Sequence, residues 1–171
     1  KCQIVWQEER WDTGASAIKE ELEQMFFGQY QHSIDPKGRL TIPANYREQT
    51  ADGVFVTEGF DHNLSVYSKD RYTHVANNLA KLSITKADTR DLYRKIFGRS
   101  YELNYDSAGR ILIPAGLRQL AGLKDEVVIV GVGDIFELWS PAAWEAQQTR
   151  FDNPEADSGR WEAFDITTRG E

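Results

Sequence analysis

The chain has 171 residues, 40% of them hydrophobic, and carries a net charge of −7. It contains enough apolar residues for a core, but it has no secretory signal pattern and no apolar run near the roughly 18 residues of a membrane span. The single cysteine, Cys2, cannot form an internal disulfide, which predicts a reducing, cytosolic location.

The negative charge weakly disfavours a nucleic-acid partner, but it is concentrated at the two ends of the chain. Residues 1–24 carry 3 basic and 6 acidic groups, and residues 151–171 carry 2 and 6. Residues 25–150 carry 15 of each and are neutral. A local basic surface on this central part is therefore compatible with the composition.

The first predicted unit is a β-hairpin over residues 30–42. Apolar and polar residues alternate on both sides of Asp35-Pro36-Lys37-Gly38, and alternation indicates strands with one buried face. Asp, Pro and Gly at the first, second and fourth positions are typical of a type I turn. We therefore predict this turn at the tip of the hairpin.

Further elements follow this hairpin in a regular order. Pro43 starts a predicted short helix that runs through Arg47. Residues 54–60 and 64–67 predict a second pair of strands. Ser68 can cap a helix that extends to about Leu82.

Residues 83–99 predict a linker helix. Thr85 and Asp88 have the spacing of a capping-box variant. Residues 81–99 hold six basic and two acidic side chains, a net charge of +4. This run indicates either a solvated helix face, which we favour, or a second basic contact surface.

The first unit then recurs. The sequence NYDSAGRILIP at residues 104–114 repeats SIDPKGRLTIP at residues 33–43 with an offset of 71 positions. It predicts a second hairpin with its turn at 106–109, a helix from Pro114 to Gly122, strands at 126–132 and 136–139, and a last helix after Ser140. Because each copy has only about 55 residues, we expect the two to share one core.

The two ends lie outside the repeat. Residues 1–24 are either a helical extension or a translated upstream segment, with Met25 as the true start. Residues 151–171 are acidic and aperiodic, which predicts a mobile tail.

The repeated turns contain the candidate site. Asp and Gly are explained by turn structure alone, but a turn does not require the arginine that follows it in both copies. Arg39 could brace the loop by pairing with Asp35, or it could point outward to a phosphate or a guanine edge, which we favour. Lys37 and His32 accompany it, whereas the second copy has Ala108 and Leu103 at those positions. The first turn is therefore the stronger cationic surface.

Signals for an enzyme are weak. His32, His62 and His74 are scattered, and no cluster has the spacing of metal ligands. Gly131-Val132-Gly133 leads from one strand into another, a context that rejects a nucleotide-binding fingerprint. We predict no catalytic residues and no cofactor.

Three segments resemble the MraZ family of the AbrB/SpoVT-like swapped-hairpin superfamily. They are MFFGQYQHSIDPKGRLTIPANYR at 25–47, DSAGRILIPAGLR at 106–118 and VVIVGVGDIFELWSPAAWE at 127–145. The resemblance covers residues 25–150. It implies an α+β fold in which two tandem hairpin units form one pseudo-two-fold β-barrel with flanking helices. The expected divisions are 1–24, 25–82, 83–99, 100–150 and 151–171.

The resemblance also implies a function. Members of the family are bacterial transcriptional regulators that bind short direct repeats in the promoter of a division and cell-wall gene cluster, as rings of subunits. The family's arginine of the Asp-x-x-x-Arg motif corresponds to Arg39, with Arg110 as its second-copy counterpart and Lys37 and His32 nearby. This implies a cytoplasmic, nucleoid-associated repressor bound to double-stranded DNA. Because superfamily relatives also pair with toxins, an antitoxin-like interaction module is the alternative.

Overall fold

The computed structural model describes residues 24–152, so the predictions for residues 1–23 and 153–171 lie outside the described residues. The strands of the described part are β1 Gln29–Ser33, β2 Arg39–Thr41, β3 Val54–Glu58, β4 Leu64–Ser68, β5 Tyr101–Leu103, β6 Arg110–Leu112, β7 Glu126–Gly131 and β8 Phe136–Trp139. Its helices are α2 Ala44–Gln49, α3 Lys69–Leu79, α4 Ala87–Ile96, α5 Ala115–Leu120 and α6 Pro141–Phe151. The predicted mixed α+β class is confirmed.

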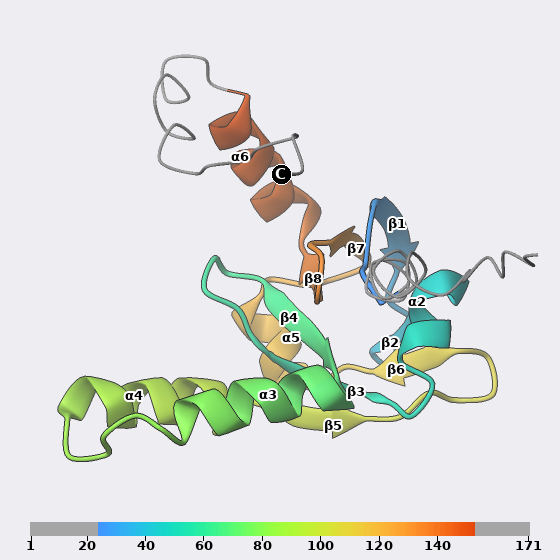
Figure 1. Ribbon diagram of the computed structural model, residues 1–171. Helices are drawn as coiled ribbons and strands as arrows, with labels where there is room; N and C mark the ends of the chain where they lie inside the picture. The colour runs from blue at the N-terminus through green and yellow to red at the C-terminus, as the bar shows by residue number, and fades with distance from the viewer. Residues whose placement is uncertain (1–23, 153–171) are drawn as a thin grey trace, which may run out of the picture.

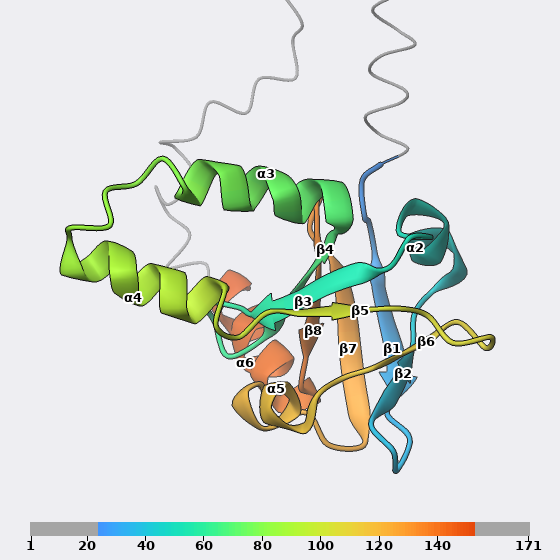
Figure 2. The ribbon, with the colours of Figure 1, turned by 90° about the horizontal axis from the view of Figure 1, so that it is seen from below.

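The strands form an antiparallel six-stranded sheet in the order β1-β7-β8-β4-β3-β5, and β2 pairs with β6 in a second, two-stranded sheet (Figures 1 and 2). The order of the large sheet is symmetric, because each strand of one repeat has its counterpart at the mirror position. Edge strand β1 pairs with β7 of the second repeat, and edge strand β5 pairs with β3 of the first. Each repeat thus completes the sheet of the other.

The predicted hairpins form only at their tips. In the first, Ile34 bridges Leu40 and the amide of Gly38 donates to the carbonyl of Asp35 at 2.8 Å. Beyond this point β1 pairs with β7 and β2 pairs with β6, because each strand buries its apolar side against the other repeat. The predicted pseudo-two-fold β-barrel is not confirmed: within residues 24–152 the large sheet does not close, and β1 and β5 are its two edge strands.

One hydrophobic core serves both repeats. Leu40 and Ile42 from the first and Ile111 and Ile113 from the second are at most 1% exposed and belong to the same buried cluster. These are the alternating positions that follow the two turns. Burial of such side chains stabilises a fold by about 1.5–3 kcal/mol each, and neither repeat contains enough of them to form a core alone.

Helices α3, α4 and α6 cover the other face of the large sheet, whereas α2 and α5 contribute Tyr46 and Leu117 to the shared core. On the first-repeat side, Tyr72 of α3 stacks on Phe55 of β3 with ring centroids 4.2 Å apart. On the second-repeat side, Trp144 of α6 packs against Trp139 of β8. Figures 1 and 2 both show α3 and α4 projecting together from one side of the sheet.

Most predicted helix ends are found where local chemistry placed them. The hydroxyl of Ser68 accepts from the amide of Arg71 at 3.2 Å, and that of Ser140 from Ala143 at 3.3 Å. Two details were wrong. Helix α3 ends at Leu79 rather than Leu82, which is 45% exposed. Thr85 does not cap α4, because its hydroxyl bonds to Ser83 instead.

None of the helices within residues 24–152 is long and apolar enough to span a membrane.

Candidate nucleic-acid interface

The small sheet of β2 and β6 displays both repeated arginines on one face. Arg39 lies opposite Leu112, and Arg110 lies opposite Thr41. These four residues share the outer face of the ribbon, because Leu40 and Ile111 between them are fully buried. The fold therefore brings together two positions that are 71 residues apart in the chain.

Each ribbon strand is preceded by one of the repeated turns, residues 35–39 and 106–110, which we call the paired turns. The carboxylate of Asp35 accepts from the amides of Lys37 and Arg39 through Oδ1, at 2.9 and 3.0 Å. Asp106 accepts from the amides of Ala108 and Arg110 at 3.0 and 2.9 Å. The aspartates are thus required by turn structure, as the sequence indicated.

The same hydrogen bonds lower the pKa of both carboxyl groups. For Asp35 the backbone amide of Arg39 is the main cause of the lowered pKa. For Asp106 the side chain of Arg110 is the main cause, and the pKa falls from 3.8 to about 2. Both carboxylates therefore stay ionised at neutral pH, and the pKa of Arg110 is raised in turn.

The two arginines use their nitrogens differently. Arg39 donates through Nε to Asp35 at 2.6 Å, and within residues 24–152 no hydrogen bond engages its terminal nitrogens. Arg110 donates through Nε at 2.8 Å and lies 2.7 Å from Asp106 through Nη2, while its Nη1 lies 3.8 Å from Asp35 of the other turn. The bracing that the sequence left open is therefore present in both turns. Of the two arginines, Arg39 is the one whose terminal nitrogens have no partner among the described residues.

Two further arginines lie at this site, and the sequence alone did not predict them there. Arg118 covers Gly38, so that a Cβ at this glycine would lie 2.9 Å from the Arg118 Cζ. Arg47 covers Gly109 in the same way, with Cζ at 2.6 Å from such a Cβ. Each arginine is anchored by Nε to a carbonyl of its own repeat, Arg47 to Ile42 at 3.0 Å and Arg118 to Ile113 at 3.1 Å. The signal in the sequence that could have identified them is their matching position in the two repeats, 71 residues apart.

Backbone hydrogen bonds lock the paired turns to each other. The amide of Ile42 donates to the carbonyl of Gly109 at 3.2 Å, and the amide of Ile113 donates to that of Gly38 at 3.0 Å. The two turns therefore form one rigid surface. Including Arg47 and Arg118, that surface carries five cationic side chains and two carboxylates, Lys37, Arg39, Arg47, Arg110 and Arg118 against Asp35 and Asp106.

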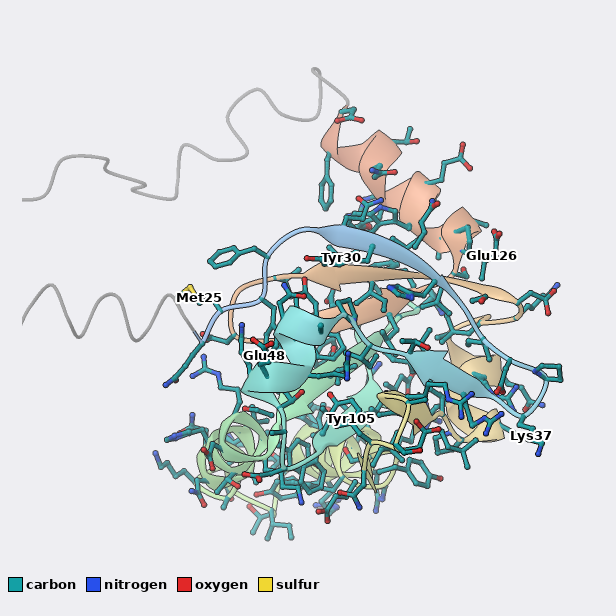
Figure 3. All side chains as sticks on the ribbon, turned by 90° about the vertical axis from the view of Figure 1, so that its right-hand side faces the viewer. Met25, Tyr30, Lys37, Glu48, Tyr105 and Glu126 are labelled. Atoms are coloured by element: carbon teal, nitrogen blue, oxygen red, sulfur yellow. The ribbon has the colours of Figure 1, made fainter. Side chains whose placement is uncertain are left out.

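The remaining candidates occupy different positions. Lys37 is exposed at the tip of the first turn, at the opposite end of the molecule from Met25 in Figure 3. His32 lies on β1 opposite Val127, half-buried and on the same side of the strand as Ile34. Lys37 is thus part of the exposed turn surface, whereas His32 belongs to the adjoining strand.

The basic side chains of α4, and that of Arg99 just after it, are largely engaged within the described chain. Arg94 pairs with Asp91 at 2.7 Å. Lys95 and Arg99 both pair with Glu58. Arg90 donates to two backbone carbonyls just before the helix. This geometry favours the solvated-face interpretation of the linker region.

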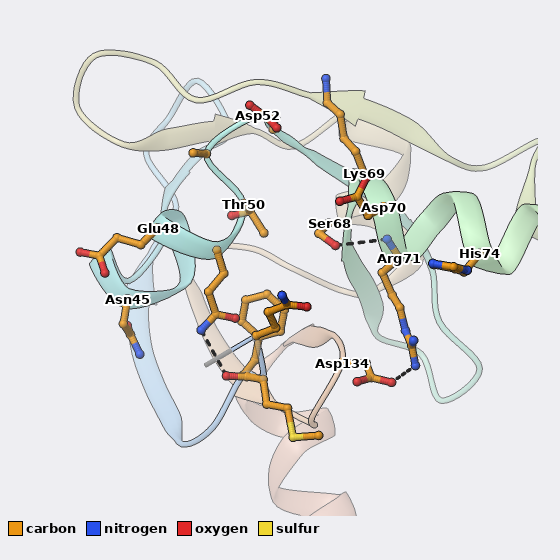
Figure 4. A pocket seen from close by; sticks show the side chains of 16 residues that line it. Asn45, Glu48, Thr50, Asp52, Ser68, Lys69, Asp70, Arg71, His74 and Asp134 are labelled. Atoms are coloured by element: carbon orange, nitrogen blue, oxygen red, sulfur yellow. Dashed lines mark hydrogen bonds and ion pairs between the residues drawn. The ribbon is translucent and has the colours of Figure 1, made fainter. Parts of the chain in front are cut away.

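A cavity of about 1000 Å³ lies between α2 and the start of α3 (Figure 4). Positively and negatively charged side chains line it, and two of them, Arg71 and Asp134, form an ion pair. The half-buried Gln49 also lines it and donates a hydrogen bond to the carbonyl of Met25 at 3.2 Å. None of its lining residues belongs to the paired turns. Across residues 24–152 no cluster of His, Cys, Asp or Glu could hold a metal ion.

The chain matches known proteins over the part that contains these features. Residues 25–95 and 96–162 each match the family model described as "MraZ protein, putative antitoxin-like". Proteins named transcriptional regulator MraZ from Roseiflexus castenholzii and Alkaliphilus oremlandii are 42% and 43% identical to it over 121 residues, which is 71% of this chain and 85% of each relative. The protein of that name from Heliobacterium modesticaldum is 44% identical over 120 residues, 70% of this chain and 84% of the relative. The chain therefore belongs to the MraZ family, whose members are regulators of transcription rather than enzymes.

Proposed function

We propose that this protein is a transcriptional regulator that binds double-stranded DNA through the β2–β6 ribbon and the paired turns. The observation that supports it is the shared outer face of the ribbon, where Arg39 and Arg110 lie on the same side with Thr41 and Leu112 between them. The major groove of B-form DNA admits a two-stranded β-ribbon. A rigid ribbon with two arginines on one face has the form and the charge for that groove.

The side chains divide into two roles. Lys37 at the exposed tip contacts phosphate and sets the position of the turn, and His32 supports it from β1. Arg39 reads a base edge, because its two terminal nitrogens match the paired acceptors of guanine. Arg110 contributes less, because Nε and Nη2 are both directed to Asp106.

The resemblance to the MraZ family supports a more specific proposal about the DNA target and the assembly. The DNA is a promoter with short direct repeats ahead of division and cell-wall genes, and binding represses it. Several copies form a ring, each contributing the two hairpin units 25–82 and 100–150 joined by 83–99, and the hairpin tips of adjacent copies engage successive repeats. Such multivalency compensates for a weak single contact. A protein with this role resides in the cytoplasm, associated with the nucleoid.

Gel shifts with a duplex of promoter repeats test the proposal. Arg39→Ala is expected to abolish binding, since one bidentate arginine contact is worth about 1–3 kcal/mol, or roughly 5- to 150-fold, and the loss recurs in every copy. Arg110→Ala should lose less. Arg94→Ala on α4 is the matched control and should bind as the unmodified protein does.

The melting temperature and the mass in solution are measured on the same variants. Both should remain nearly unchanged in Arg39→Ala. If that variant unfolds or dissociates, the arginine is a brace for the turn and not a DNA contact. Normal binding by a folded Arg39→Ala protein would reject the interface altogether.

An antitoxin-like protein-interaction module is the second candidate, favoured by the antitoxin-like description of the matching family model. In that role the acidic C-terminal residues would occlude a partner enzyme. Deleting residues 153–171 separates the two functions, because DNA binding should survive the deletion whereas binding of a toxin partner should not.

A further inference from the structure

Arg47 and Arg118 occupy equivalent positions at the two ends of the β2–β6 ribbon. Arg47 is anchored through Nε to the carbonyl of Ile42, the residue that follows β2 by one position. Arg118 is anchored in the same way to Ile113, which follows the end of β6. Because β2 and β6 are antiparallel, the ends of these two strands lie at opposite ends of the ribbon. The two arginines therefore flank the face that carries Arg39 and Arg110.

The length of the ribbon matches the width of a DNA groove. Arg118 covers Gly38 at one end, and Arg47 is held by Ile42 at the other. A strand advances about 3.3 Å per residue, so these ends are about 13 Å apart. The major groove of B-form DNA is about 12 Å wide. A ribbon that lies across the groove would bring one arginine to the phosphate backbone on each side.

The terminal nitrogens of both arginines are without a partner in the described part of the chain. Each side chain makes its hydrogen bond through Nε, and no carboxylate within residues 24–152 forms an ion pair with either. Both residues are half-buried. Removing a cation partly from water without supplying an anion is unfavourable. A bound phosphate would supply that anion.

The arginines of the repeated turns differ in this respect. Arg39 lies 2.6 Å from the carboxylate of Asp35, and Arg110 lies 2.7 Å from that of Asp106. Each turn therefore largely neutralises its own arginine. The surface as a whole, with five cations and two carboxylates, keeps a net charge of +3. That excess is located on Lys37, Arg47 and Arg118.

Two features prepare Arg47 and Arg118 for anion binding. The Nε hydrogen bond fixes the plane of each guanidinium, so less freedom is lost when the terminal nitrogens bind. The pair is also present in both repeats, whereas Lys37 is replaced by Ala108 in the second. Arg47 and Arg118 are thus the part of the excess charge that follows the symmetry of the ribbon.

We propose that Arg47 and Arg118 each bind one backbone phosphate through their terminal nitrogens, on the two DNA strands that border the groove occupied by the ribbon. This inference rests on the proposed function and deepens it. The attraction for DNA comes largely from this flanking pair, which no sequence motif had identified, while Arg39 reads a base edge. The two kinds of contact can be separated by measurement.

The first test is the salt dependence of binding to a duplex with one promoter repeat. The logarithm of the affinity falls with the logarithm of the salt concentration by about 0.9 for each neutralised phosphate. Arg47→Gln and Arg118→Gln should each reduce this slope by about 1 per bound copy, and the double variant by about 2. The lysine variants at both positions keep the charge and should keep the slope. Arg94→Gln on α4 removes the same charge elsewhere and should leave the slope unchanged.

The second test alters the DNA instead of the protein. Each phosphate of the duplex is replaced in turn by a neutral methylphosphonate. The unmodified protein should lose about tenfold in affinity at one position on each strand, as expected for one hydrogen bond to a charged group. Arg118→Gln should be insensitive to one of these two replacements and Arg47→Gln to the other. Insensitivity of this kind assigns each arginine to its phosphate.

Melting temperatures show whether the glutamine variants are folded. A folded double variant that keeps the full salt slope rejects the inference, and so does a variant that stays sensitive at both phosphates. If the variants do not fold, the unmodified protein still decides, because sensitive phosphates confined to one strand contradict the proposed arrangement.

These outcomes are distinct from failure of the proposed function. If Arg39→Ala abolishes promoter binding while the double glutamine variant keeps the slope, only the role of the flanking arginines is wrong. If the unmodified protein binds no promoter duplex even at low salt, both proposals fail.

Discussion

Arg118 lies directly over Gly38 of the opposite repeat, close enough that a Cβ on this glycine would be 3.0 Å from the Arg118 Nε. The arginine cannot move away freely, because that same Nε donates to the carbonyl of Ile113 at 3.1 Å. The exchange is reciprocal, with Arg47 over Gly109. The glycines of the paired turns are therefore needed twice, for a left-handed backbone and for contact with the other repeat.

We therefore predict that Gly38→Ala destabilises the protein by more than the strain of a positive φ alone, because the new Cβ would also clash with Arg118. Gly38 has a φ of 86°, and a Cβ at such a φ costs about 1–2 kcal/mol. The matched control is Gly133→Ala, whose φ is 82° but whose Cβ would meet nothing within 4 Å. Urea denaturation should show the larger loss in the free energy of unfolding for Gly38→Ala. Equal losses in the two variants would mean that the arginine simply moves aside.

The lowered pKa of Asp106 predicts a defined dependence of stability on pH. The pKa of Asp106 is about 2 in the folded protein and near its ordinary value of 3.8 in the unfolded chain. The ionised carboxylate therefore contributes stability above about pH 4. That contribution is lost as the pH falls through 2. The melting temperature of Asp106→Asn should therefore lie below that of the unmodified protein by a constant amount from pH 5 to 8.

Below pH 4 the two melting temperatures should converge. Protonation of Asp106 in the unmodified protein removes the negative charge that the substitution to Asn has already removed. Gln147→Ala, which leaves the turns intact, serves as the control and should follow the unmodified protein at every pH. A gap that persists undiminished to pH 2 would show that Asp106 acts through its shape and not its charge.

Lys37 and Arg39 predict different responses of DNA binding to salt and to sequence. A lysine that neutralises one phosphate per copy accounts for close to one counterion, so Lys37→Ala should reduce the salt dependence of binding and weaken specific and random duplexes alike. Arg39→Ala should instead lose discrimination between them. Fluorescence anisotropy at four salt concentrations measures both quantities. The division of roles fails if Lys37→Ala weakens only the specific duplex.

The sequence by itself determined the features that depend on local chemistry. Asp35, Gly38 and their counterparts form the expected turns, since an aspartate can accept from amides two and four residues on and glycine tolerates a positive φ. The serine caps and the alternation of buried residues followed from the same short-range rules. The repeat and the family resemblance identified Arg39 and Arg110 as a related pair.

Only the tertiary structure decided which strands pair and what each arginine contacts. A strand read in sequence shows which face is buried but not its neighbour, so the hairpins expected at β1–β2 appear as pairings of β1 with β7 and β2 with β6. Two features depend on how the two repeats, 71 residues apart, pack together: Arg118 covers Gly38, and the terminal nitrogens of Arg39 have no partner in the described part of the chain. Such contacts arise from the packing of a shared core, and no local pattern specifies them.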